Sequence, residues 1–150
     1  MKPDAVTCLL DVNVLIALAW PQHVHHEGAH AWYKRRGKDS WATCPLTQIG
    51  FVRVSSNAKI VPDAVSPREA MALLRRITGL PGHRFWSDDA VPTDQRVFES
   101  AALVGHRQVT DAYLLALCIA RNGRLATFDR GVQELLADGA AREKFVELLS

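Results

Sequence analysis

The chain has 150 residues, of which 48% are hydrophobic and 23% charged, and its formal net charge is +2. This length fits one domain over residues 1–150 with a real hydrophobic core, and the composition excludes a disordered chain. A net charge this small does not by itself indicate a nucleic-acid-binding protein. No apolar run reaches the roughly 18 residues that cross a bilayer, and the N-terminus lacks a secretory core. We therefore expect a cytoplasmic protein without a membrane partner.

Three cysteines, Cys8, Cys44 and Cys118, are widely spaced and form no C-x-x-C motif. Each lies in an apolar context that suggests burial. They predict three free thiols rather than a disulfide framework or a zinc site.

Short apolar strands alternate with helices along the first half of the chain. The segment after Pro45 is ambiguous, because its valines favour a strand whereas its apolar spacing after a proline favours a helix, and we predict a helix. The expected elements are a strand at 5–10, a helix at 14–20 ended by Pro21, a helix at 23–36, a strand at 41–44 and a helix at 45–57.

The second half continues the alternation. Ser66 is expected to cap a helix with Pro67 at its first position, and Thr110 is expected to cap an apolar helix that Asn122 and Gly123 end. The expected elements are helices at 66–79, 94–103, 111–121 and 132–137, strands at 84–87 and 125–128, and a strand or helix at 144–149. The alternation predicts an α/β fold, a mostly parallel sheet covered by helices on both faces.

Three aspartates are expected at one edge of this sheet. Asp11 and Asp129 each follow a buried strand, and Asp111 lies in the first turn of an apolar helix. Ligands of open α/β sheets gather at this edge, and a cluster of carboxylates without His or Cys favours Mg²⁺ or Mn²⁺. Such a site indicates phosphodiester chemistry by metal-activated water. The alternative for each aspartate is to cap a helix or turn a loop. Two roles are open for Asn13: its side chain caps the helix start, or it holds a neighbouring carboxylate in place.

Four segments together resemble the PIN domain, and specifically a VapC-type toxin ribonuclease: LLDVNVLIAL, CPLTQIGFVRVSSN, GHRQVTDAYLLAL and RLATFDRGV. They occur in the expected order over essentially the whole chain. The resemblance implies a three-layer α/β/α sandwich, Mg²⁺- or Mn²⁺-dependent cleavage of RNA, a homodimer and a cognate VapB-type antitoxin.

The resemblance also implies roles for individual residues. Asp11, Asp111 and Asp129 match the acidic metal-binding positions, and Asn13 and Thr127 match supporting ones. The remaining acidic position is usually a glutamate where this chain has Gln48, so we expect at most one well-bound metal in the absence of substrate. Asp94 is a candidate substitute acid, although helix capping is the alternative.

Basic side chains would hold the phosphate backbone of the RNA. Arg53 follows Gln48 by one or two helical turns and is the leading candidate, with an ion pair to an acidic neighbour as its alternative role. Four further candidates are Lys34, Arg35, Arg36 and Arg107. The alternative for the first three is that they are solvated cations at the end of a helix, where they suit the helix dipole.

Two other functions compete with the ribonuclease. His26, Glu27 and His30 match the H-E-x-x-H signature of zinc metalloproteases, but Gly28 weakens the helix and no third ligand is marked. A non-catalytic module that keeps the fold for RNA or protein binding is the other alternative, and Gln48 is the residue that favours it.

Overall fold

The computed structural model describes residues 6–36, 39–91 and 105–150, without the side chain of Arg107. Its centre is a five-stranded sheet in the order β3-β2-β1-β4-β5, and every neighbouring pair is parallel. The strands are β1 (Cys8–Leu10), β2 (Trp41–Thr43), β3 (His83–Phe85), β4 (Arg124–Thr127) and β5 (Val146–Leu148). The α/β prediction is confirmed, and within the described ranges the sheet is entirely parallel.

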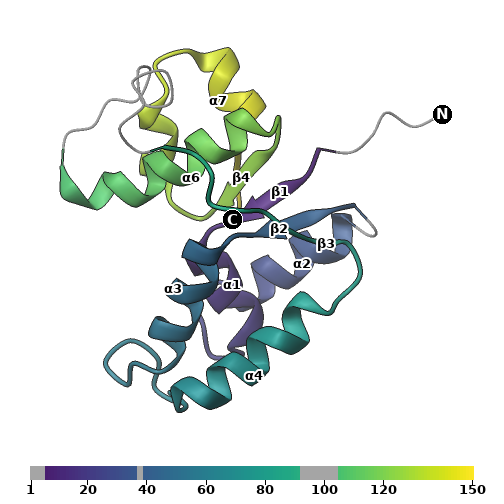
Figure 1. Ribbon diagram of the computed structural model, residues 1–150, viewed down its shortest axis with the longest axis vertical. Helices are drawn as coiled ribbons and strands as arrows, with labels where there is room; N and C mark the ends of the chain where they lie inside the picture. Colours follow the sequence, from purple (N-terminus) through teal and green to yellow (C-terminus); the bar gives the residue numbers. More distant parts are fainter. Residues whose placement is uncertain (1–5, 37–38, 92–104) are drawn as a thin grey trace.

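Helices cover both faces of the sheet (Figure 1). One layer holds α1 (Val12–Ala19), α2 (His26–Arg36), α3 (Pro45–Ser55) and α4 (Pro67–Thr78), and the other holds α6 (Val109–Ala120) and α7 (Gly139–Phe145). Two 3₁₀ helices, η1 (His106–Gln108) and η2 (Arg130–Leu135), accompany the second layer. None of the helices in the described ranges is long and apolar enough to span a membrane.

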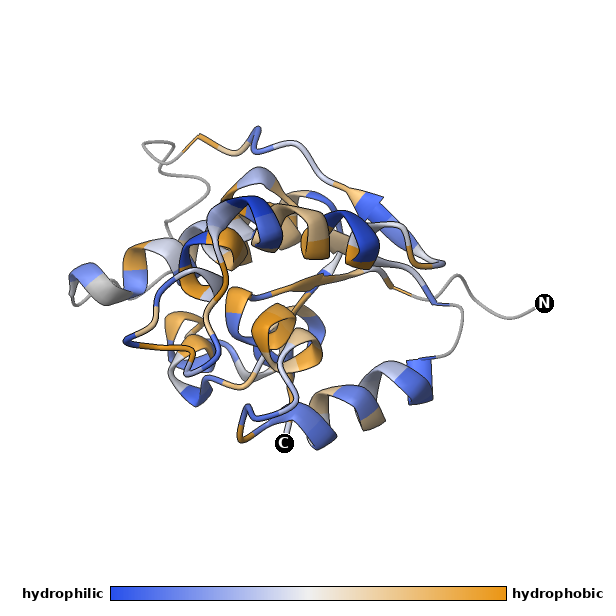
Figure 2. Ribbon diagram, turned by 90° about the horizontal axis from the view of Figure 1, so that it is seen from below, coloured by the Kyte–Doolittle hydropathy of each residue, from blue (hydrophilic) through white to orange (hydrophobic). Residues whose placement is uncertain are grey.

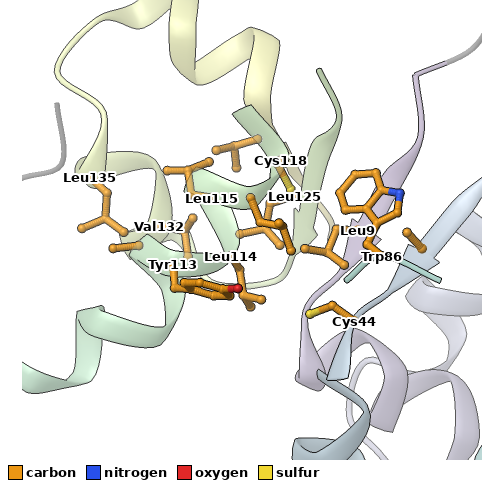
Figure 3. Packing of buried hydrophobic residues seen from close by; sticks show 14 of the residues in the cluster. Leu9, Cys44, Trp86, Tyr113, Leu114, Leu115, Cys118, Leu125, Val132 and Leu135 are labelled. Atoms are coloured by element: carbon orange, nitrogen blue, oxygen red, sulfur yellow. The ribbon is translucent and has the colours of Figure 1, made fainter. Parts of the chain in front are cut away.

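Alternate residues of each strand point into the two layers, because side chains of a strand alternate between faces. Leu9 and Leu125 pack against α6, whereas Cys8, Leu10 and Ala126 pack against α1 and its neighbours. Figure 2 shows the apolar residues concentrated between the helices, in the centre of the molecule. The cluster on the α6 side is drawn in Figure 3, where residues of α6, β1, β4 and η2 meet.

Helix α6 is apolar at nearly every position because it is enclosed on most sides. All seven residues of 112–118 are buried, as the uninterrupted apolar run predicted. The prediction that Thr110 caps this helix is wrong: η1 leads directly into α6, which begins at Val109 with Gln108 at the N-cap. Because the 3₁₀ helix η1 runs directly into α6, the start of α6 needs no hydroxyl cap.

The chain leaves α6 through Asn122, which has a left-handed φ of 53°, and enters β4 through Gly123. A Cβ at position 123 would lie 2.9 Å from the carbonyl oxygen of Thr7 and would also strike the Trp86 ring. Only glycine fits this entry to the sheet, and the predicted helix stop is confirmed.

The remaining helices and strands mostly follow the predicted ones, with different bounds at some ends. The segment after Pro45 is a helix, Ser66 caps α4, and the C-terminal segment contains the strand β5 rather than a helix after Val146. The 132–137 helix is a 3₁₀ helix that begins at Arg130, and α2 begins at His26 after turns over 21–25. The helix expected at 94–103 lies outside the described residues, as does Asp94. The cysteines are free and buried, as predicted.

Candidate active site

Asp11 is placed by the register of β1 and β4. Leu10 pairs with Ala126, so the next residues, Asp11 and Thr127, stand side by side at the carboxyl edge of the sheet. The Thr127 hydroxyl donates to Asp11 Oδ2 at 2.9 Å, and the backbone N–H of Val12 donates to Oδ1 at 2.7 Å. Asp11 therefore caps α1 and is held at both oxygens. The prediction that Thr127 supports this carboxylate agrees with the geometry.

Burial determines the chemistry of Asp11. Asp11 is only 8% exposed, and this burial raises the pKa of its carboxyl above the ordinary value. The negative charge of Asp129 raises the pKa further. The hydrogen bonds from Thr127 and Val12 act in the opposite direction, because they favour the charged form.

Asp129 is joined to the same hydroxyl from the other side. Its backbone N–H donates to Thr127 Oγ1 at 3.0 Å, and its Oδ1 accepts from the N–H of Gly131 at 2.8 Å. The carboxylate thus caps η2 and lies at the solvent-exposed rim. A single threonine hydroxyl therefore connects two of the three aspartates.

Asp111 approaches from the helix layer. It lies in the first turn of α6, half-buried, and its pKa is raised from 3.8 to about 7. Burial is the largest cause, followed by the negative charges of Asp11 and Asp129. The three aspartates that the sequence predicted as a group are thus electrostatically coupled at one edge of the sheet.

A hard divalent cation fits the donor type and the charge of this group. Carboxylates that repel one another are stabilised by a cation between them, and the pKa values of Asp11 and Asp111 are raised in its absence. In the described ranges, however, no three His, Cys, Asp or Glu side chains are arranged so that they could hold a metal ion as they stand. Asp11 is held at both oxygens, so a cation at this group would be bound with Asp111 and Asp129 side chains in other rotamers.

Helix α3 packs tightly against the start of α1. A Cβ at Gly50 would lie 2.6 Å from Val12 Cγ2, so only glycine permits this approach. Val12 is the residue whose N–H holds Asp11. The contact therefore keeps the helix start, and the carboxylate that caps it, in one position.

Gln48 lies in the first turn of α3, next to the end of β2. Its Nε2 donates to Thr43 Oγ1 at 3.0 Å, and the same hydroxyl lies 2.7 Å from His83 Nε2. No hydrogen bond joins Gln48 to the described aspartates. In this rotamer Gln48 supports the end of β2, and its role toward a cation at the carboxylates stays a prediction.

Asn13 also differs from its expected role. Asp11 itself caps α1, and Asn13 is exposed on the first turn, where it lines a separate cavity. The amide therefore does not hold a carboxylate in this structure.

The candidate RNA-binding cations divide between the two edges of the sheet. Arg36 donates to the carbonyl oxygens of Val6 and Ser40, which precede β1 and β2, so it lies at the edge opposite the aspartates. Lys34 and Arg35 are exposed on the same end of α2. The phosphate role predicted for this cluster is therefore corrected, because the helix runs away from the site.

Arg53 remains on the appropriate helix. It is exposed in the last turn of α3 and lines a groove between α3 and α4 together with Gln48. No ion pair joins it to a residue that the structure describes. Arg107 lies in η1, two residues before the start of α6, and only its backbone is described.

The H-E-x-x-H motif has a structural explanation. His26 Nδ1 lies 2.7 Å from the carbonyl oxygen of Ala17, and His30 Nε2 lies 2.9 Å from that of Leu18. Both rings therefore satisfy carbonyls at the end of α1, where a helix leaves acceptors without intrahelical partners. Glu27 is exposed, and the zinc-protease alternative is wrong for this pair.

A polar cluster at the far edge was not anticipated from the sequence. Glu147 of β5 accepts from Trp32 Nε1 at 2.8 Å and from Arg124 Nη1 at 3.3 Å, and it lies 4.0 Å from Arg36. It joins α2, β4 and β5. A glutamate inside an otherwise apolar final strand was the only signal in the sequence.

A family model described as the PIN domain matches residues 8–137. The chain belongs to the PIN domain family. It is 45% identical over 136 residues to Ribonuclease VapC39 of Mycobacterium tuberculosis, covering 91% of this chain and 95% of that protein. It is 48% identical over 124 residues to Ribonuclease VapC38 of the same organism, covering 83% and 86%. The resemblance to the VapC group is therefore confirmed.

Solved structures of low identity agree in fold. A VapBC2 structure from Rickettsia felis bound to a promoter DNA fragment has a TM-score of 0.65 at 12% identity, covering 96% of this chain and 99% of that one. A FitAB structure bound to the IR36 DNA fragment has a TM-score of 0.62 at 18% identity, covering 94% of each chain. The three-layer α/β/α architecture of this PIN domain is thus shared with both.

Proposed function

We propose that this PIN-domain protein is a metal-dependent endoribonuclease, the toxin of a VapBC-type pair, with Mg²⁺ as its cofactor and Mn²⁺ as a substitute. The relatives named as VapC ribonucleases support the reaction class. The observation that carries the site is the raised pKa of Asp111, which reflects its closeness to Asp11 and Asp129. Three coupled carboxylates at the carboxyl edge of a parallel sheet form a site for a hard cation and an RNA phosphate.

The residues contribute in different ways. Asp11 is the fixed oxygen donor, since Thr127 and the Val12 amide hold it in one orientation. Asp111 and Asp129 are the adjustable donors, because neither is locked at both oxygens. When bound, the cation would lower the pKa of a water molecule and polarise the phosphoryl oxygen for in-line attack.

Protonation of Asp111 sets the pH range of the site. Without a cation, this carboxyl takes up a proton as the pH falls through neutrality, since its pKa is raised to about 7. Ligation needs the ionised form, so binding of the cation releases this proton. Activity should therefore increase as the pH rises through neutrality.

The partners follow from the same relatives. An RNA is the substrate, a VapB-type antitoxin is the inhibitor, and a homodimer is the expected assembly. The R. felis relative is described as a VapBC2 complex on promoter DNA. We infer that this chain likewise pairs with an antitoxin.

Cleavage of structured RNA tests the proposal directly. Wild type with Mg²⁺ should cut the RNA, and Asp11→Ala and Asp111→Asn should each reduce the rate by about a hundredfold or more. Asp138→Asn is the matched control, because Asp138 is an exposed aspartate whose side chain caps α7 by accepting from the Ala140 N–H, a cap that asparagine can also make. EDTA should abolish cleavage by wild type and by the control.

Two outcomes would contradict the proposal. Intact RNA after incubation with folded, Mg²⁺-saturated wild type would favour the non-catalytic binding module. Cleavage at the wild-type rate by both site variants would indicate that the reaction occurs elsewhere. In cells, expression of the chain alone should arrest growth, and Asp111→Asn should relieve the arrest.

A further inference from the structure

Three polar side chains form a hydrogen-bonded relay at the end of β2. Gln48 Nε2 lies 3.0 Å from Thr43 Oγ1, and the same hydroxyl oxygen lies 2.7 Å from His83 Nε2. Gln48 belongs to the first turn of α3, Thr43 ends β2 and His83 begins β3. The relay is separate from the hydrogen bonds that hold Asp11 and Asp129.

The lengths of the two contacts indicate which groups donate. A threonine hydroxyl carries a single hydrogen, so it can donate to one neighbour while it accepts from the other. The 3.0 Å contact has the usual length for an amide N–H donor, whereas 2.7 Å is the usual length for a hydroxyl donor. Gln48 Nε2 therefore donates to Thr43, and the Thr43 hydroxyl donates to His83 Nε2. His83 Nε2 is then an unprotonated acceptor, and the proton of the neutral ring is on Nδ1.

The His83 ring is held where it can accept this bond. His83 pairs with Trp41, so both side chains point to the same face of the sheet as Thr43, two residues further along β2. The rings of Trp41 and His83 have centroids 4.8 Å apart, and Trp41 Nε1 donates to the carbonyl oxygen of Pro81 at 3.1 Å. Burial lowers the pKa of His83, so the ring is neutral at neutral pH and above.

The orientation of the Gln48 amide follows from this order of donors. An amide carries its donor and its acceptor on different branches, so the bond from Nε2 to Thr43 leaves the oxygen Oε1 directed elsewhere. In the part of the chain that the structure describes, no hydrogen bond engages Oε1. The relay thus fixes which end of this amide is free.

The relay lies at the carboxyl edge of the sheet. β1 and β2 are parallel neighbours, and their register, continued by one residue, places Thr43 beside Leu10, at a strand separation of about 4.8 Å. Asp11 follows Leu10 directly. The Gln48 side chain is therefore held at the end of the strand next to the one that leads into Asp11.

We propose that His83 is a positioning residue of the cation site: through the Thr43 hydroxyl it holds the Gln48 amide with its oxygen free. Hard cations take oxygen ligands, and an outward amide NH₂ group would repel one. The relay therefore makes Gln48 an acceptor, as a carboxylate would be, without adding a fourth negative charge. The inference rests on the proposed function, since it concerns a cation at the same edge of the sheet.

The position of the proton on the His83 ring tests the relay without metal or RNA. Long-range proton–nitrogen nuclear magnetic resonance spectra, recorded in EDTA at pH 8, separate protonated from unprotonated ring nitrogens, and His83→Ala identifies the signals. Wild type should carry the proton on Nδ1. In Gln48→Glu the new carboxylate can only accept from Thr43, so the hydroxyl must turn and His83 Nε2 should become protonated. Gln22→Glu, the same change in the turn after α1, should leave His83 unchanged.

Mn²⁺ binding, measured by calorimetry, tests the consequence for the cation. His83→Ala and Thr43→Val each free the amide to turn, so each should weaken Mn²⁺ binding by about tenfold. The double variant should bind about as well as either single one, because both changes break the same relay, whereas independent losses would multiply. Arg84→Ala is the control, because Arg84 is the next residue of β3 and is exposed, and its affinity should stay within about twofold of wild type.

The outcomes separate the relay from the proposed function. A wild-type His83 with its proton on Nε2, or unchanged ring nitrogens in Gln48→Glu, would overturn the relay. Unchanged Mn²⁺ affinity in His83→Ala and Thr43→Val would overturn its positioning role. If wild type still cut RNA with Mg²⁺ in either case, the ribonuclease proposal would stand without it. If wild type cut no RNA although the ring nitrogens and the Mn²⁺ affinities behaved as expected, the function would fail while the relay remained.

Discussion

Replacement of Asp111 by asparagine removes a charge that the folded protein resists. The pKa of this carboxyl is raised from 3.8 to about 7 by burial and by the charges of Asp11 and Asp129. One pKa unit corresponds to about 1.36 kcal/mol, so the full shift amounts to about 4 kcal/mol. Solvent screening at a half-buried position reduces this to about 2 kcal/mol. Without a cation, Asp111→Asn should therefore be more stable than wild type by about 2 kcal/mol above pH 7.

The stability gain from Asp111→Asn depends on pH, because this carboxyl ionises at a higher pH in the folded protein than in the unfolded chain. Below pH 3.8 the carboxyl is protonated in the folded and the unfolded chain, so it carries no penalty. Between pH 3.8 and 7 the unfolded chain ionises while the folded protein keeps its proton, and the stability of wild type falls as the pH rises. The gain from Asp111→Asn should thus be nearly complete at pH 8 and mostly lost at pH 4.5.

Thermal and urea unfolding followed by circular dichroism, in EDTA at pH 4.5, 6 and 8, measures this dependence. At pH 8 the midpoint should rise by about 4 to 8 °C for a chain of this length. Asp138→Asn serves as the control and should show no gain that grows with pH. A pH-independent difference between Asp111→Asn and wild type would refute the claim that the three carboxylates form one coupled group. Saturating Mg²⁺ should stabilise wild type and not the variant.

Three further changes address the rest of the fold and site. Thr127→Val removes the donor to Asp11 and should cost about 1 to 3 kcal/mol in urea unfolding and weaken Mn²⁺ binding measured by calorimetry; unchanged Mn²⁺ affinity would count against the supporting role. Gln48→Glu should permit a second cation, visible as two Mn²⁺ sites in crystals without RNA, against at most one in wild type. Glu147→Gln leaves its arginine partners short of a countercharge and should lower the unfolding free energy by about 2 kcal/mol without altering RNA cleavage.

The arrangement of elements was predictable because its signals are local. Strand-then-aspartate segments at Asp11 and Asp129, and an uninterrupted apolar helix after Asp111, each follow from nearest neighbours in the chain. In a parallel sheet all such strand ends meet at one edge, so grouping the three aspartates needed no knowledge of packing. The helix after Pro45 followed in the same way from its proline and its spacing.

The roles that the sequence left open or misplaced belong to side chains whose partners lie on other elements of the fold. Arg36 resembles a free cation until the strands that precede its acceptors are placed beside it. His26 and His30 resemble zinc ligands until α1 ends beneath them. Gln48 turns to Thr43 because β2 ends at that point, a contact that depends on how α3 leaves the sheet. Sequence spacing carries none of this information.

The Thr127 hydroxyl decides which aspartate takes up the first proton. It accepts from the backbone N–H of Asp129, so its single hydrogen points to Asp11 Oδ2, and the Val12 amide occupies the other oxygen. Asp11 is thereby kept as a pure acceptor, and a proton entering the group goes to Asp111. The buried Asp11 keeps a fixed orientation, whereas the half-buried Asp111 is the carboxyl whose pKa is raised to about 7.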